Sequence, residues 1–195
     1  FENSDLKANV TKETESIIRK NCIFSSNTST IPITSLAKSS KRPEQFIGLH
    51  FFSPVDKMPL VEIILGKETK EDAIAACFDY VIKIGKTPII VNDGRGFYTS
   101  RVFTTYVSEG INCLSEGISP ALIENAGKMA GKPVGPLSVA DEVSIELMYK
   151  ILSQTVRDLG EDAVEKNVLA VTDLFVNKLK RLGRKSGGGF YDYLK

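Results

Sequence analysis

The chain has 195 residues, of which 42% are hydrophobic and 25% are charged, and its formal net charge is +1. This composition is typical of a globular protein with one large or two small domains. Lys and Arg are interspersed with Asp and Glu, which argues against a nucleic-acid partner. No apolar run approaches the roughly 20 residues that span a bilayer. Three cysteines without a CxxC pair, and a single histidine, predict no metal site and a reducing compartment.

Up to about residue 91 the hydrophobic pattern alternates between helical and extended segments. It predicts helices at 6–20, 33–37 and 69–84, and strands at 22–25, 46–52, 60–65 and 87–91. The segment Thr69-Lys70-Glu71-Asp72 resembles a capping box, and Gly85 is placed as the C-terminal stop of the same helix. Helices mixed with apolar strands are expected for part of an α/β sheet.

After Asn92-Asp93-Gly94-Arg95-Gly96 the pattern is helical only. We expect a helix over 97–116, one from Pro120 with Ser119 as N-cap, one after Ser138, and one near 163–179. The first of these is apolar on more than one face, which favours a core position, with a subunit interface as the alternative. Gly94 and Gly96 lack the GxGxxG pattern of a phosphate loop and are typical of a hinge. The sequence therefore predicts an α/β domain at 1–93 and an all-α domain at 94–195.

His50 and Glu62 are polar residues inside two of the apolar strand segments. Separately, a strand histidine is more often a satisfied core residue, and a strand glutamate often marks a solvated edge. A buried carboxylate, however, is costly to desolvate unless it is paired. If the two strands are neighbours, Glu62 can fix the tautomer of His50 and raise its basicity, which makes a general-base dyad.

Five motifs, in this order along nearly the whole chain, resemble the L-3-hydroxyacyl-CoA dehydrogenase family. They are Ser26-Asn27-Thr28-Ser29, the run from Gly48 to Val55, Leu60-Val61-Glu62-Ile63, Gly96-Phe97 with Arg101, and Gly187-Gly188-Gly189-Phe190-Tyr191. The segments 95–101 and 134–142 are most similar to the multifunctional α-subunits of fatty-acid β-oxidation complexes.

The resemblance implies oxidation of a 3-hydroxyacyl-CoA to the 3-ketoacyl-CoA with NAD, at a cleft between a Rossmann domain and a helical domain. By position, His50 would be the base that takes the hydroxyl proton and Glu62 would orient it. Ser29 would hydrogen-bond the substrate oxygen and lie near the nicotinamide. These roles agree with the dyad, because removing hydride from an alcohol requires that its proton be accepted.

Further positions match cofactor and substrate contacts of the family. Glu2, Lys7 and Lys185 correspond to NAD contacts, although without the resemblance they are better interpreted as a helix-start carboxylate and two solvated lysines. Ser53, near the nicotinamide, and Ser100, at the substrate, stand where the family commonly has asparagine. Serine forms similar hydrogen bonds but reaches less far.

The glycine-rich turn and ribose-binding acid of a Rossmann domain do not occur in the sequence. The resemblance therefore implies a partial Rossmann domain, with its N-terminal half missing, followed by an all-α C-terminal domain. We expect such a piece of a longer protein to bind NAD poorly and to have little activity alone.

The resemblance also implies a homodimer through the helical domain, with the helix at 97–116 as a contributor, and a possible thiolase subunit as partner. The compartment would be the bacterial cytoplasm, the mitochondrial matrix or the peroxisome. The alternative function is a non-catalytic assembly module. A cluster of Ser29, His50 and Glu62 would favour the enzyme, whereas dispersed side chains and a large apolar helical surface would favour the module.

Overall fold

The computed structural model describes residues 2–194, and the chain divides into two compact units, Phe1–Val102 and Phe103–Lys195. The division falls inside helix α4 (Thr99–Ser115). The boundary predicted from the sequence lies earlier, directly after the last strand, and stays a prediction. None of the helices in the described part of the chain is long and apolar enough to cross a bilayer.

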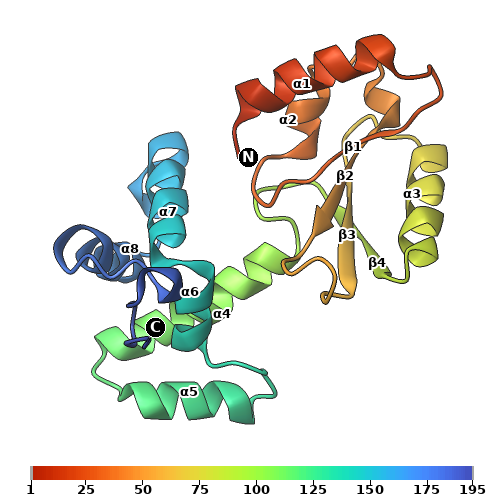
Figure 1. Ribbon diagram of the computed structural model, residues 1–195. Helices are drawn as coiled ribbons and strands as arrows, with labels where there is room; N and C mark the ends of the chain where they lie inside the picture. Colours follow the sequence, from red (N-terminus) through yellow and green to blue (C-terminus); the bar gives the residue numbers. More distant parts are fainter. Residues whose placement is uncertain (1, 195) are drawn as a thin grey trace. The chain divides into compact units, whose positions relative to one another are not determined.

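The first unit is built on a four-stranded mixed sheet (Figure 1). Its strands are β1 (Phe24–Ser26), β2 (Phe46–Phe51), β3 (Leu60–Leu65) and β4 (Thr87–Asn92), in the order β1-β2-β3-β4. β1 and β2 are parallel, as are β3 and β4, whereas β2 and β3 are antiparallel. The strand positions predicted from the sequence are confirmed to within about two residues.

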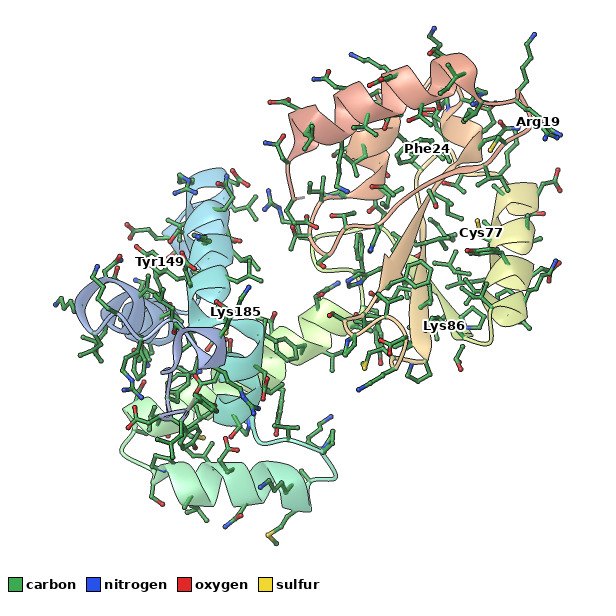
Figure 2. All side chains as sticks on the ribbon, viewed as in Figure 1. Arg19, Phe24, Cys77, Lys86, Tyr149 and Lys185 are labelled. Carbon is green, nitrogen blue, oxygen red and sulfur yellow. The ribbon has the colours of Figure 1, made fainter. Side chains whose placement is uncertain are left out.

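Helices cover both faces of this sheet. The helices of this unit are α1 (Ser4–Ile17), α2 (Ile33–Ala37), the short 3-10 helix η1 (Pro43–Gln45) and α3 (Glu71–Lys83), of which α2 and α3 pack on the sheet. Strand side chains alternate between the faces, so one face packs with α2 around Phe46 and Ile64, and the other packs with α3 around Ile47 and Ile63. Figure 2 labels Cys77 on α3, which belongs to this second cluster. The catalytic candidates, His50 and Glu62, lie on the α2 face.

Two details at the ends of α3 test the predicted helix signals. The prediction of a capping box is wrong, because α3 begins at Glu71 without a side-chain cap. The Thr69 hydroxyl instead donates to the carbonyl of Phe46 at 2.7 Å. The predicted stop is confirmed, since Gly85 follows the helix with a φ of 77°.

Gly48 explains how closely α2 approaches the sheet. A Cβ atom at this position would lie 2.7 Å from Cγ1 of Ile33 and 2.9 Å from Cβ of Ile64. Only glycine therefore allows Ile33, which is 0% exposed, to pack against β2. Because α2 follows the loop that carries Ser29, this packing brings the loop toward His50 on the same face of β2.

The second unit is helical. It contains the later part of α4, then α5 (Pro120–Met129), α6 (Pro136–Val143), α7 (Ile145–Leu159) and α8 (Lys166–Asp173), with η2 (Glu161–Ala163), a π-helix (Leu174–Lys178) and η4 (Arg184–Ser186). Val107 and Ile111 of α4 are 0% exposed within its core. The core position predicted for this helix is thus confirmed for its later part.

Two predicted helix boundaries in this unit are wrong. A helix was expected after Ser138, but α6 begins at Pro136, whose missing N–H suits the first turn. Ser144 has a φ of 102°, which ends α6, and its hydroxyl then caps α7 by accepting from the amide of Leu147. One helix was also expected near 163–179, where the structure has α8 from Lys166 and then a π-helix.

A buried carboxylate attaches the C-terminal segment to α6. Asp141 is 1% exposed and accepts hydrogen bonds from the amides of Phe190 (2.8 Å) and Tyr191 (3.0 Å) and from the hydroxyl of Tyr193 (2.9 Å). A Cβ on Gly189 would collide with the Asp141 carboxylate. The glycine run therefore lets the backbone come close enough for these hydrogen bonds to form.

Candidate active site

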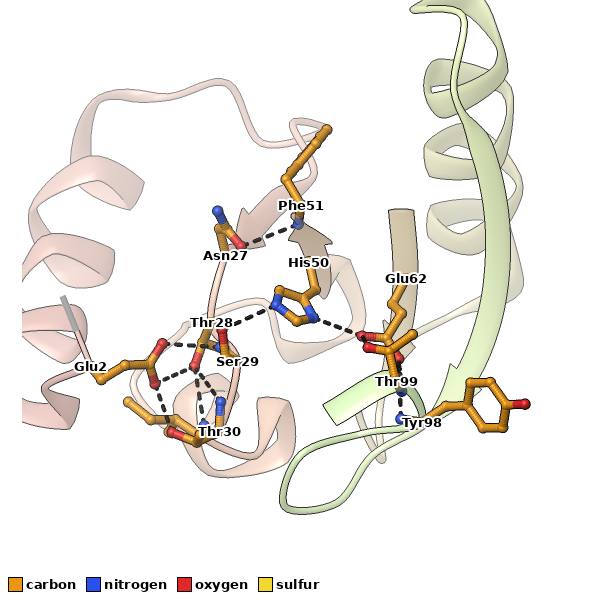
Figure 3. A network of polar contacts seen from close by, with 11 residues as sticks. Glu2, Asn27, Thr28, Ser29, Thr30, His50, Phe51, Glu62, Tyr98 and Thr99 are labelled. Carbon is orange, nitrogen blue, oxygen red and sulfur yellow. Dashed lines mark hydrogen bonds and ion pairs between the residues drawn. The ribbon is translucent and has the colours of Figure 1, made fainter. Parts of the chain in front are cut away.

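The contact predicted between His50 and Glu62 is present. His50 and Glu62 are directly opposite each other on the antiparallel strands β2 and β3, and Nδ1 of His50 lies 2.6 Å from Oε2 of Glu62 (Figure 3). Both residues are buried, with 5% of His50 and 0% of Glu62 exposed. The condition stated for the dyad, that the two strands be neighbours, is met.

The beginning of α4 supplies the other donors to Glu62. The amides of Tyr98 (3.1 Å) and Thr99 (2.8 Å) donate to Oε1, and the hydroxyl of Thr99 donates to Oε2 at 2.7 Å. Gly96 and Phe97, with φ of 73° and 45°, form the left-handed turn that precedes these amides. The first amides of a helix have no partner within the helix and favour a negative charge, so they suit a carboxylate.

The charge state of Glu62 follows from these contacts. Burial raises the pKa of the carboxyl group, but hydrogen bonds from His50, from both groups of Thr99 and from the Tyr98 amide outweigh it, so the pKa is below its ordinary value. Glu62 is therefore an anion at neutral pH and can only accept hydrogen bonds. The proton of the neutral imidazole must then be on Nδ1, which leaves the lone pair of Nε2 available.

Ser29 faces this lone pair. Its Oγ lies 3.0 Å from Nε2 of His50, so the hydroxyl can donate to the ring (Figure 3). The ring also contacts Phe52 and Phe97, with centroids 4.4 Å and 6.0 Å away. The three predicted catalytic residues thus form one line of hydrogen bonds, from Ser29 through His50 to Glu62.

The two predicted NAD contacts near the start of the chain both bind the loop that carries Ser29. The Glu2 carboxylate accepts from the amide of Ser29 at 3.0 Å, and from the hydroxyls of Thr28 and Thr30. Nζ of Lys7 donates to the carbonyl of Asn27 at 2.8 Å. Burial raises the pKa of Glu2, but the hydrogen bonds to the loop and the charge of Lys7 lower it overall. These contacts hold the loop in place, and the cofactor role stays a prediction.

The remaining predicted residues lie outside this hydrogen-bonded line. Ser53 is exposed two residues after β2, and Ser100 is half-buried in the first turn of α4. Lys185 is exposed in η4, within the second unit (Figure 2). Their contacts with cofactor or substrate stay predictions.

Thr99 was not singled out from the sequence. Two signals pointed to it: a buried carboxylate needs several donors, and a helix was expected to begin near residue 97, where unpaired amides occur. What no pattern revealed is that these two features lie side by side, since Thr99 and Glu62 are 37 positions apart.

Two family models cover almost the whole chain. The NAD binding domain of 3-hydroxyacyl-CoA dehydrogenase matches residues 1–94, and the C-terminal domain of the same family matches residues 96–193. Among curated proteins, the fatty acid oxidation complex subunit alpha of Shewanella loihica is 43% identical over 193 residues, which cover 99% of this chain and 27% of that subunit. The chain thus spans about a quarter of the length of this relative.

Solved structures agree with these matches. The (S)-3-hydroxybutyryl-CoA dehydrogenase of Ralstonia eutropha is 34% identical, with a TM-score of 0.90 over 100% of this chain and 69% of that chain. The 3-hydroxybutyryl-CoA dehydrogenase of Escherichia coli is 30% identical, with a TM-score of 0.88 over 99% of this chain and 41% of that chain. With both domain models matched in order and relatives at this identity, the chain belongs to the 3-hydroxyacyl-CoA dehydrogenase family.

Proposed function

We propose that this chain carries the proton-transfer machinery of an NAD-dependent oxidation of L-3-hydroxyacyl-CoA to 3-ketoacyl-CoA. The observation that carries the proposal is the hydrogen-bonded line of Ser29, His50 and Glu62, with its basic nitrogen directed at a hydroxyl group. A non-catalytic assembly module has no need of a buried carboxylate that fixes one imidazole tautomer.

In this mechanism the substrate hydroxyl lies beside Nε2 of His50 and gives its proton to that nitrogen. The Glu62 anion stabilises the imidazolium that forms, through the 2.6 Å contact at Nδ1. The Ser29 hydroxyl is close enough to Nε2 to hydrogen-bond the same substrate oxygen. Bound NAD would supply the acceptor for the hydride from C3 of the substrate.

The position of Ser29 and His50 fits the nicotinamide end of NAD. Both residues lie near the carboxyl ends of the parallel strands β1 and β2, where ligands bind in open α/β sheets. We assign Glu2, Lys7 and Ser53 to the same end of the cofactor, and Ser100 to the substrate. The other end is different, because no GxGxxG turn occurs among the 195 residues to hold the pyrophosphate. We infer that this chain behaves as part of a Rossmann domain.

A chimera tests the function. The part of the Ralstonia enzyme that precedes the region matched by this chain can be fused to residue 1. We expect the chimera to oxidise 3-hydroxybutyryl-CoA with NAD, and the 195-residue chain alone to show little turnover and weak NADH binding. Absorbance of NADH and equilibrium dialysis measure these two quantities. Comparable turnover by the chain alone would refute the inferred lack of a pyrophosphate site, and a folded but inactive chimera would refute the function.

We also propose that the second unit self-associates. Leu147, Ile151 and Leu159 are spaced by four and eight positions along α7, so they share one face, and they are 45%, 41% and 63% exposed. We expect light scattering to give the mass of a dimer, and Leu147→Glu with Ile151→Glu to give a monomer. A monomeric wild-type chain at micromolar concentration would contradict this.

Because the Shewanella relative of this chain is a fatty acid oxidation complex subunit, we further propose a thiolase subunit as partner, in a reducing compartment.

A further inference from the structure

The Glu62 carboxylate has all of its acceptor positions occupied. An ionised carboxylate offers about four lone-pair sites. Here Oε1 accepts two backbone amides, and Oε2 accepts Nδ1 of His50 and the hydroxyl of Thr99. Thr99 is thus bound to the same oxygen atom that holds the imidazole.

This arrangement matters because the carboxylate has no strong orientation of its own. The last torsion of a glutamate side chain is broad and roughly two-fold, so it does not direct Oε2 toward Nδ1. The orientation is set by the donors around the group. Of the donors other than His50, the two amides bind only Oε1, which leaves the Thr99 hydroxyl as the group that fixes Oε2.

The geometry points to Thr99 as a positioning residue. We propose that its hydroxyl, acting through Glu62, keeps His50 in the tautomer whose Nε2 accepts the substrate proton. The proposal rests on the proposed function for its catalytic meaning, but the tautomer itself is a property of the chain without ligands. The Thr99 amide and hydroxyl both donate to Glu62, so Thr99 acts by orienting the carboxylate.

The single histidine makes the tautomer directly measurable. Chain labelled with ¹⁵N and lacking any histidine tag gives one pair of ring nitrogen signals, and a protonated ring nitrogen differs strongly in shift from an unprotonated one. For the neutral ring we expect wild-type chain to show two widely separated signals, with the proton on Nδ1. In Thr99→Val the ratio of the Nδ1-protonated tautomer to the Nε2-protonated tautomer should fall several-fold. The two nitrogen signals should therefore move toward each other.

Two further variants separate positioning from a general effect on the fold. Thr99→Ser keeps the hydroxyl and should restore the wild-type separation. Thr104→Val makes the same replacement at an exposed position of the same helix and should leave the ring nitrogen signals of His50 unchanged. If Thr99→Val lowers the urea midpoint but leaves the ring signals unchanged, Thr99 only stabilises the helix and the proposal is overturned.

The outcome remains decisive if Thr99→Val does not fold. In that case Thr99→Ser carries the test, because a folded serine variant with mixed tautomers would overturn the proposal and an unchanged pair of signals would support it. In the chimera, Thr99→Val should lower kcat several-fold with little change in KM. The ring signals are measured without NAD or substrate. If the chimera is inactive but the ring signals still depend on Thr99, the proposed oxidation is refuted and the positioning role of Thr99 is supported.

Discussion

Replacing His50 by glutamine in the chimera should lower kcat for oxidation of 3-hydroxybutyryl-CoA by about 10²–10⁴-fold, which is the usual contribution of a positioned general base. Glutamine has a similar length and can still hydrogen-bond Glu62 and Ser29, but it cannot accept the substrate proton. Hydride then has to leave an alcohol whose proton has no acceptor. The rate of NADH formation at saturating substrate measures the effect.

The control for this substitution is Ser29→Ala. It removes one neutral hydrogen bond to the substrate oxygen and leaves the base intact, so kcat should fall by about tenfold, equivalent to about 1.4 kcal/mol. Circular dichroism should show the same helix content in both variants. If His50→Gln loses no more activity than Ser29→Ala, then His50 is a satisfied core residue and another group takes the proton.

The dyad could be predicted because it depends on short-range patterns. Two apolar strands joined by a short connection favour an antiparallel pair, and alternation then places His50 and Glu62 on definite faces. Their separation of 12 positions puts them opposite each other once the connection has its observed length. The prediction thus needed only the strand period and the cost of burying a carboxylate.

The donors to the carboxylates could not be predicted, because they come from distant parts of the chain. Glu62 accepts from residues at the start of α4, Asp93 accepts from the amides of Ile33 and Thr34 at the start of α2, and Glu124 accepts from the start of α6. In each case a side chain satisfies helix amides that its own sequence neighbourhood does not reveal. Periodicity describes which face is apolar, but it carries no information on these pairings.

The errors in helix boundaries have a similar origin. Ser138 looked like a helix start, but its amide and hydroxyl both donate to Glu124, so its place inside the first turn of α6 is set by a partner on α5. The predicted capping role of Thr69 failed because its hydroxyl binds the backbone of β2. Ser and Thr hydroxyls are satisfied by whichever backbone group lies nearest, and tertiary structure decides which one that is.

Gly189→Ala should strongly destabilise the second unit, whereas Gly188→Ala should not. A Cβ at Gly189 would overlap the Asp141 carboxylate, and neither glycine has a positive φ, so the difference between the two variants is steric. Moving the segment away from Asp141 loses hydrogen bonds from the amides of Phe190 and Tyr191 to a buried charge. Overpacking and the loss of hydrogen bonds to a charged group should together lower the free energy of unfolding by about 3 kcal/mol or more.

The adjacent position provides the matched control. At Gly188 the nearest atoms to an added Cβ belong to the guanidinium group of Arg181, at 3.4 Å, which is an ordinary van der Waals contact. We expect Gly188→Ala to change the free energy of unfolding by less than about 1 kcal/mol. Urea unfolding followed by circular dichroism suits a chain without tryptophan, and hydrogen exchange at Phe190 and Tyr191 reports the segment itself. Equal urea midpoints for the two variants would show that the contact with Asp141 does not hold the C-terminal segment, because only Gly189 lies against that carboxylate.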